Sequence, residues 1–185
     1  MFFSKKNKKK MVVNEEKAPK RVEESNDEHF NSEDYTVGTR DVADKVTLFN
    51  EEHVSTVKGT LDFSDMIDKD KMDSIVQFIH SSPNDKDRLV EETMGVKGAR
   101  WNLGDYDRII ITPIGVIVPE SSPGNYPHVM DTIQSFVTFL GRFQIGVNNI
   151  NIVQSFDSVD GAKVKFFVGE RGRLSFSAPK NYYKK

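Results

Sequence analysis

Hydrophobic residues recur at regular spacing only after about residue 35. Val57, Leu61 and Phe63 fall on one side of an extended segment, which predicts a strand over residues 54–63. Apolar residues at i, i+3, i+4 and i+7 then predict an amphipathic helix, whose apolar face is formed by Met72, Ile75, Val76 and Ile79. Asp68 is the predicted cap of this helix, which should end near His80. A second, short helix is expected over residues 85–94, closed by Gly95.

The most apolar stretch, residues 108–118, predicts a buried strand that Pro113 must break or bulge, because proline cannot donate to a sheet. Prolines, serines and a glycine predict a loop over residues 119–127. Residues 128–143 then predict the second strong helix, with Asp131 as a cap and Gly141 near its end. Its apolar face is formed by Ile133, Phe136, Val137, Leu140, Phe139 and Phe143.

Three further strands are expected over residues 150–156, 163–168 and 173–177, joined by turns that contain glycine. The element order predicts an α+β domain with a mostly antiparallel sheet and two main helices on one face, preceded by a disordered N-terminal arm. The predicted organisation is a basic-then-acidic arm over 1–35, a single domain over 36–179 and a basic tail over 180–185.

Charge is strongly segregated along the 185 residues, although the formal net charge is only -2. Residues 1–10 contain five lysines and no acid, whereas residues 21–34 contain one arginine and six carboxylates. The chain has no cysteine, which excludes a disulfide framework, a thiolate zinc site and a cysteine nucleophile.

Catalytic and metal-binding patterns do not emerge, so we expect no enzymatic activity, no metal and no cofactor. The four histidines are not at metal-ligand spacing, and the sequence has no glycine-rich phosphate loop and no nucleophile elbow. Trp101 is expected at the edge of a core rather than on a stacking surface. Only a pocket that gathered Arg100, Asp105 and a histidine would favour an enzyme.

The basic end has the composition of a membrane-binding segment. Lysines are attracted to anionic lipid, and neighbouring aromatic rings can insert at the interface. The predicted membrane-binding residues are Phe2, Phe3, Lys5, Lys6, Lys8, Lys9 and Lys10. The same charges would also suit nucleic acid, and the residues predicted for that alternative are Lys5, Lys6, Lys8, Arg171 and Arg173. A third reading is that the segment only aids solubility. The acidic residues that follow could fold back on these lysines.

The opening MFFSKKNKKK, followed by a polar arm and an α+β core, resembles the matrix proteins of rhabdoviruses. The resemblance implies a viral structural protein of the virion that lies on the inner face of the host membrane. Such a protein binds a nucleocapsid or ribonucleoprotein and self-associates during assembly, here through apolar faces that include Phe139 and Phe143. The sequence lacks the PPxY or PTAP-like motif that many of these proteins carry.

A second likeness is to the bacterial septum protein SepF, which has a membrane-targeting segment, a charged linker and a small α/β domain. Ile111, Thr112 and Pro113 followed by Val116, Ile117 and Val118 are similar to the end of a strand in that domain. This likeness implies a membrane-tethered division adaptor at the cytoplasmic face. Both families imply a tethered, self-associating protein.

Overall fold

The computed structural model describes residues 34–49 and 52–184. These residues form one antiparallel sheet of eight strands. The strands are β1 (Tyr35–Thr39), β2 (Val54–Phe63), β3 (Ile110–Thr112), β4 (Gly115–Val118), β5 (Gly124–Asn125), β6 (Val147–Phe156), β7 (Ala162–Val168) and β8 (Leu174–Pro179). Their order across the sheet is β1-β8-β7-β6-β2-β4-β3, and β5 pairs with the start of β2.

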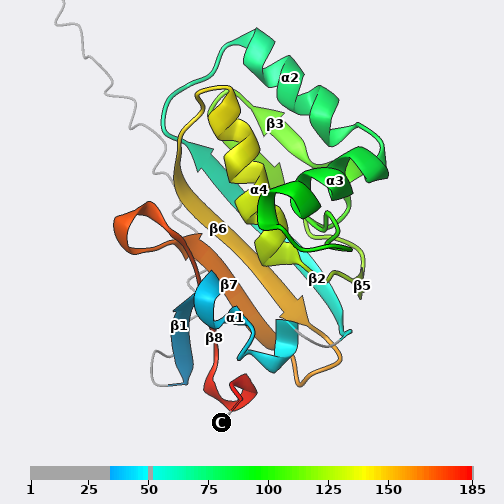
Figure 1. Cartoon of the computed structure of the whole chain (residues 1–185), viewed down its shortest axis with the longest axis vertical. Coiled ribbons are helices and arrows are strands. Elements are labelled where there is room, and N and C mark those ends of the chain that lie inside the picture. The colour runs from blue at the N-terminus through cyan, green and yellow to red at the C-terminus, as the bar shows by residue number, and fades with distance from the viewer. Residues whose placement is uncertain (1–33, 50–51, 185) are drawn as a thin grey trace, which may run out of the picture.

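The helices of the described residues lie on one side of this sheet (Figure 1). They are α1 (Arg40–Ala43), α2 (Lys69–Ile79), α3 (Pro83–Met94) and α4 (Val129–Arg142), with single 3-10 turns at Thr47–Phe49, Tyr106–Arg108, Glu170–Gly172 and Lys180–Tyr182. The predicted α+β class, with antiparallel pairing and helices on one face, is therefore confirmed. Residues 1–33 of the predicted arm lie outside the described residues.

The centre of the sheet is the long pair β2 and β6, and β2 has the predicted limits. Val57, Leu61 and Phe63 are buried beneath the helices, as expected. Gly59 sits in this strand at φ 148°, and a Cβ built there would lie 2.0 Å from the backbone oxygen of Asn151. Only glycine allows the two strands to approach this closely.

The predicted break at Pro113 in the strand over residues 108–118 is confirmed, but the expectation that this stretch is buried holds for only one of its faces. The chain turns at Pro113 and forms the hairpin β3–β4 at the sheet edge, where the Thr112 hydroxyl donates to the Gly115 oxygen over 2.9 Å. Only one face of this hairpin is covered, so Val116 is buried whereas Ile110 is 50% exposed and Ile117 42%. A run of apolar residues does not distinguish a strand buried on both faces from one buried on a single face.

Helices α2 and α3 follow local capping signals. The Asp68 carboxylate accepts a hydrogen bond from the Lys71 backbone N–H over 2.9 Å, which confirms the predicted cap of α2. Helix α3 begins two residues before the predicted start, because Ser82 caps it and Pro83 occupies its first position. It ends at the left-handed Gly95, as predicted.

Helix α4 begins differently from the prediction. The residue preceding the helix is His128, whose backbone oxygen accepts from Thr132 N over 2.8 Å, and its own φ is 61°. Asp131 lies inside the first turn, where its carboxylate contacts Arg40 and does not cap the helix. Gly141 is the next-to-last helical residue, close to the predicted end.

The C-terminal meander β6–β7–β8 is confirmed, with strand ends within three residues of those predicted. Val164 and Phe166 of β7 are fully buried beneath the helices. The intervening residues Lys163, Lys165 and Phe167 face the opposite side, because side chains alternate along a strand.

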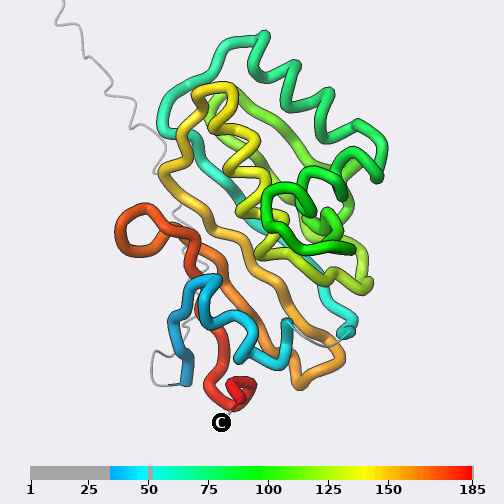
Figure 2. The backbone as a smooth tube through the Cα atoms, in the orientation of Figure 1, coloured from blue at the N-terminus to red at the C-terminus, as the bar shows by residue number. Residues whose placement is uncertain are grey.

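Strand β1 and helix α1 were not predicted, because five extended residues give no periodicity that separates them from a loop. Gly38 makes room there, since a Cβ would lie 2.7 Å from the Phe176 ring. Residues 180–185 were expected to form a basic tail, but Tyr183 donates its hydroxyl to the Thr36 oxygen over 3.2 Å and pairs with Val46. Figure 2 shows this end of the chain next to β1.

An aromatic cluster joins the helices to one another. Phe78 stacks on Phe139 with 4.1 Å between ring centres, and Trp101 meets both Phe78 and Phe136 edge to face. Trp101 is 8% exposed. The core placement predicted for Trp101 and Phe136 is therefore confirmed.

One buried cation completes the helical layer. Lys86 is 1% exposed, and its Nζ donates to the backbone oxygens of Ile79 (2.9 Å) and Ser81 (2.8 Å) at the end of α2. The same Nζ lies 3.9 Å from the centre of the Tyr106 ring. Burial lowers the pKa of Lys86, although nearby carboxylates oppose that effect. The lysine thus holds α3 against the end of α2 by satisfying otherwise unpaired carbonyls.

Candidate functional site

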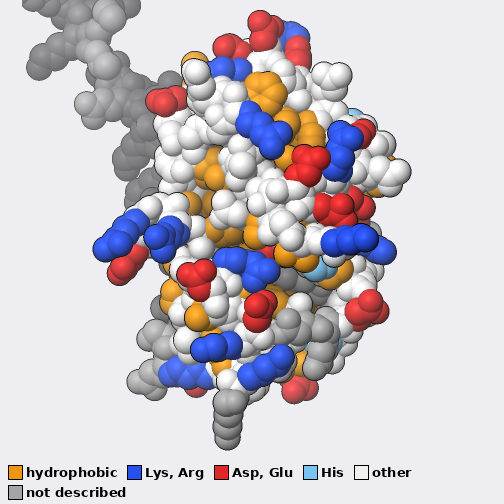
Figure 3. Space-filling model, viewed as in Figure 1, with side chains coloured by type: hydrophobic (Ala, Val, Ile, Leu, Met, Phe, Trp, Pro, Cys, Tyr) orange, Lys and Arg blue, Asp and Glu red, His pale blue; other side chains and the backbone are white. Residues whose placement is uncertain are grey.

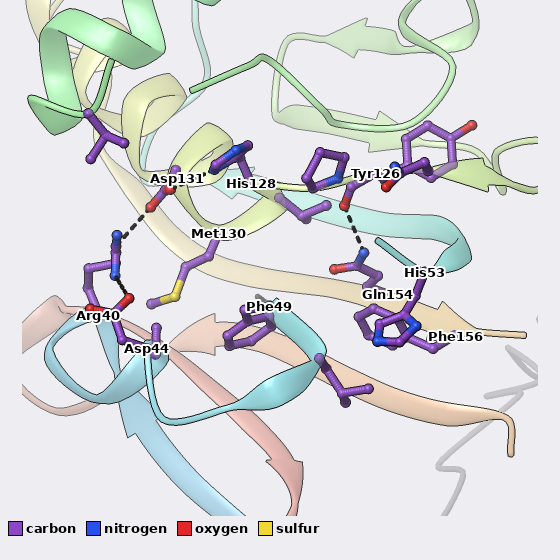
Figure 4. A pocket seen from close by; sticks show the side chains of 16 residues that line it. Arg40, Asp44, Phe49, His53, Tyr126, His128, Met130, Asp131, Gln154 and Phe156 are labelled. Atoms are coloured by element: carbon purple, nitrogen blue, oxygen red, sulfur yellow. Dashed lines mark hydrogen bonds and ion pairs between the residues drawn. The ribbon is translucent and has the colours of Figure 1, made fainter. Parts of the chain in front are cut away.

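A pocket of about 230 Å³ opens between residues 40–49 together with His53, the start of α4 and the end of β6. Figure 4 shows its side chains converging from these three elements. The polar lining includes Arg40, Asp44, His53, His128, Asp131 and Gln154. The apolar lining includes Leu48, Phe49, Met130 and Phe156.

The charged centre of the pocket is Asp131, whose side chain is 9% exposed. Its Oδ1 accepts from Arg40 Nε over 2.9 Å, and its Oδ2 lies 3.3 Å from His128 Nδ1. Arg40 also contacts Asp44 over 3.3 Å. Burial favours the neutral form of Arg40, but Asp131 and Asp44 outweigh it and hold the pKa of the guanidinium above its usual value. The Asp131 carboxylate is therefore paired with the Arg40 guanidinium within the pocket.

The floor of the pocket is fixed by Gln154 of β6, which is 3% exposed. Its amide Nε2 donates to the Tyr126 oxygen over 2.9 Å and to Ser55 Oγ over 3.1 Å. The His53 ring meets the Phe156 ring edge to face at 6.1 Å. This packing orders the loop before α4 against the sheet.

The pocket combines charged side chains with an apolar wall. A His–Asp pair is present, but Arg100 and Asp105, the residues whose presence would have favoured an enzyme, do not line it. In the described ranges 34–49 and 52–184, no three histidine, aspartate or glutamate side chains are placed to hold a metal ion. The pocket gave no sequence signal, because its residues come from segments up to 116 positions apart.

Asp105 holds the loop that forms one wall of this pocket. Its Oδ2 accepts from the backbone N–H of Ser122 over 2.8 Å and from the Ser122 hydroxyl over 3.0 Å. Tyr126 Oη lies 3.2 Å from the other carboxylate oxygen. The backbone hydrogen bond from Ser122, followed by these side-chain contacts, lowers the pKa of Asp105 below its ordinary value of 3.8.

Asp105→Asn should therefore lower the stability of the fold at neutral pH, by about 1–2 kcal/mol, because hydrogen bonds to a charged acceptor are replaced by weaker ones. The carboxyl takes up its proton at lower pH in the folded chain than in the unfolded chain. Its contribution is consequently present above about pH 4 and is lost as the pH falls through the lowered value. Thermal unfolding measured between pH 2 and 7 should show that Asp105→Asn loses less stability than the parent as the pH falls. A variant at an exposed carboxylate, Asp65→Asn, should have the same pH profile as the parent. An unchanged pH profile would contradict this role.

The residues predicted from the charge pattern are only partly within the described chain. Phe2, Phe3, Lys5, Lys6, Lys8, Lys9 and Lys10 lie outside it. Arg171 and Arg173 lie in and beside the β7–β8 turn, where both are exposed, and Arg171 has a φ of 56°. The structure does not bring these two arginines near the pocket.

The side of the sheet opposite the helices carries a second candidate surface, which we call the open face. Register places Lys58, Val153, Lys165, Ser177 and Val37 in one row across β2, β6, β7, β8 and β1. The next row contains Thr60, Asn151, Phe167 and Ser175. By contrast, basic and acidic side chains are interspersed on the helix-bearing side (Figure 3).

A groove of about 490 Å³ lies where the open face meets the β7–β8 turn. Val37 and Phe167 provide apolar surface in it, and Arg171 and Arg173 line it as well. The sheet thus places the predicted arginines beside Phe167, a combination that the sequence alone did not indicate.

An apolar patch is also exposed at the β3 edge, and we call it the edge patch. It consists of Ile110, Ile117, Ile114 and Met66, which are 50%, 42%, 68% and 78% exposed. Ile114 and Met66 are held near each other by a hydrogen bond between their neighbours, in which Ile67 N donates to the Pro113 oxygen over 2.8 Å. Phe139 and Phe143, the residues predicted to support self-association, are partly buried and pack against the core.

None of the described helices has the length and apolar character needed to cross a membrane. Comparison with protein families, curated proteins and solved structures found no significant match.

Proposed function

We propose that this chain is a non-enzymatic structural protein of the matrix type, which attaches to the surface of an anionic membrane through residues 1–10. The observation that carries the proposal is the adjacency of Phe2 and Phe3 to five lysines without an intervening acid. Each lysine near an anionic leaflet is worth roughly 1 kcal/mol, and the two rings add hydrophobic binding. In this role the domain would also contact a nucleocapsid and further copies of itself.

The experiment that tests the membrane role replaces only the aromatic pair. Phe2→Ser/Phe3→Ser should weaken co-sedimentation with phosphatidylserine-containing vesicles about tenfold or more, because the lysines alone do not insert into the bilayer. Binding to single-stranded RNA should stay within about twofold, since the phosphate contacts come from the lysines. Equal vesicle binding by the variant and the parent would contradict the proposal.

Self-association is supported by the edge patch. Strand β3 ends the sheet, so its outer backbone groups have no partner strand among the described residues. Exposed edge strands with apolar side chains readily pair with other chains.

Ile110→Lys/Ile117→Lys should therefore shift the protein toward monomer by at least about tenfold in dissociation constant. Ile110 lies on the edge strand β3, where a charge prevents pairing, and Ile117 is its cross-strand neighbour in β4, where a second charge removes the exposed apolar surface. Sedimentation velocity over a concentration series measures this. The control, Val96→Lys, changes a residue that is 37% exposed and away from the edge. Identical sedimentation of both variants and the parent would exclude the edge patch as the interface.

A second candidate function is nucleic-acid binding, which the position of Arg171 and Arg173 beside Phe167 favours. Arginine contacts with phosphate and stacking on an aromatic ring are common in single-strand binding. In that case Arg171→Gln/Arg173→Gln should weaken RNA binding and reduce its salt dependence, while vesicle binding stays unchanged.

A further inference from the structure

We propose that the pocket between Arg40, the start of α4 and the end of β6 binds a small, neutral aromatic compound that carries an N–H or O–H donor. The side-chain oxygen of Gln154 is the group that anchors this ligand. The inference goes beyond membrane attachment, because it rests on residues of the folded domain and not on residues 1–10.

The orientation of the Gln154 amide is set by its neighbours. The Tyr126 backbone oxygen can only accept a hydrogen bond, so the amide nitrogen of Gln154 must face it, at 2.9 Å. The same nitrogen donates to Ser55 Oγ over 3.1 Å. The amide oxygen of Gln154 therefore points the other way, into the pocket, as Figure 4 shows.

This oxygen is an acceptor without a donor. Gln154 is only 3% exposed, and nothing in residues 34–49 and 52–184 donates a hydrogen bond to its Oε1. Buried polar atoms are almost always paired, because an unpaired one has lost its contact with water. Water can supply the donor, and any ligand that displaces the water must bring its own. The pocket thus favours ligands with an N–H or O–H group.

The charged groups of the pocket favour a neutral ligand. Arg40 contacts both Asp131 (2.9 Å) and Asp44 (3.3 Å), so an anion would have to compete with two carboxylates. Asp131 in turn contacts Arg40 and His128, whose Nδ1 lies 3.3 Å from the second carboxylate oxygen. A cation would therefore have to compete with the guanidinium. An ionic ligand gains little from charges that already contact one another.

The apolar part of the lining favours a ring. Phe49 and Phe156 contribute aromatic side chains, and Met130 contributes a thioether, a group that packs well against aromatic rings. An apolar cavity of about 150 Å³ binds benzene. This pocket has a volume of about 230 Å³, so it has room for a ring system somewhat larger than benzene, such as that of indole.

Ligands of similar size and different polarity test the proposal on the parent chain. Indole carries one N–H donor, benzofuran has oxygen at the same position, benzoate is an anion and benzamidinium is a cation. In titrations followed by NMR, indole should bind with a Kd of about 1 mM or less and shift the side-chain NH2 signals of Gln154. Benzofuran should bind at least about tenfold more weakly, because it leaves the Gln154 oxygen unpaired. The two ions should also bind at least about tenfold more weakly than indole.

A variant that fills the pocket shows where indole binds. Ala43 lines the pocket and is 5% exposed, so Ala43→Leu should weaken indole binding at least about tenfold. The matched control is Ala162→Leu, at an alanine that is 8% exposed and lines a different pocket. That control should bind indole within about twofold of the parent. Circular dichroism verifies that both variants are folded, and the comparison of ligands on the parent chain needs neither of them.

Four results would overturn the proposal. They are no indole binding up to about 10 mM, equal affinity for benzofuran and indole, tighter binding of either ion than of indole, and parent-like indole affinity in folded Ala43→Leu. Phe2→Ser/Phe3→Ser should leave indole binding within about twofold of the parent. The ligand proposal and the membrane proposal can therefore fail independently of each other.

Discussion

Gly59→Ala should destabilise the folded chain by about 4 kcal/mol, because the added Cβ meets backbone that cannot move away and φ is unfavourable for alanine. The Cβ would lie 2.0 Å from Asn151 O and 2.6 Å from Ile152 Cα, and φ is 148°. For a domain of this size the change corresponds to a fall of about 10 °C in Tm. Thermal unfolding followed by circular dichroism measures it.

The matched control is Gly141→Ala, at a glycine whose Cβ would meet nothing within 4 Å. Gly141 lies near the end of α4, where alanine has the higher helix propensity. This variant should be as stable as the parent or more stable by up to about 1 kcal/mol. Equal effects of the two substitutions would contradict the close β2–β6 approach that forms the centre of the sheet.

The second large effect is expected from neutralising the basic end. Replacing Lys5, Lys6, Lys8, Lys9 and Lys10 by glutamine should weaken binding to phosphatidylserine-containing vesicles by roughly three and a half orders of magnitude, because each lysine contributes roughly 1 kcal/mol. Vesicle titration at 50 and 300 mM salt measures the loss, and the parent should lose affinity at the higher salt while the variant changes little.

The control for this variant is Lys69→Gln, Lys71→Gln and Lys97→Gln, which removes two exposed lysines and one half-buried lysine from the folded domain. We expect that control to bind vesicles within about threefold of the parent. A parent-like affinity after loss of all five N-terminal lysines would contradict electrostatic attachment through this segment.

Local signals explain which elements could be predicted from the sequence. Asp68 and Gly95 fix helix ends through contacts within a few residues, and the alternation in β2 reports a sheet covered on one side. These features depend on neighbours along the chain, so a short stretch of sequence is enough to predict them.

The features that were missed depend on contacts between distant segments. Asp131 pairs with Arg40, which is 91 residues away, so a carboxylate in the first turn of a helix was taken for a cap. Ile110 and Ile117 look like core residues in sequence, yet the helices cover only the other face of their hairpin. The open face and its groove combine β1, β7 and β8, and β1 itself was not predicted.

Flotation with vesicles tests the membrane proposal most directly. The full chain and a chain lacking residues 1–10 are mixed with vesicles that do or do not contain phosphatidylserine and centrifuged through a density gradient. We predict that only the full chain floats, and only with the acidic vesicles. Flotation of the shortened chain with the acidic vesicles, or of the full chain equally with both kinds, would contradict attachment through the basic and aromatic end.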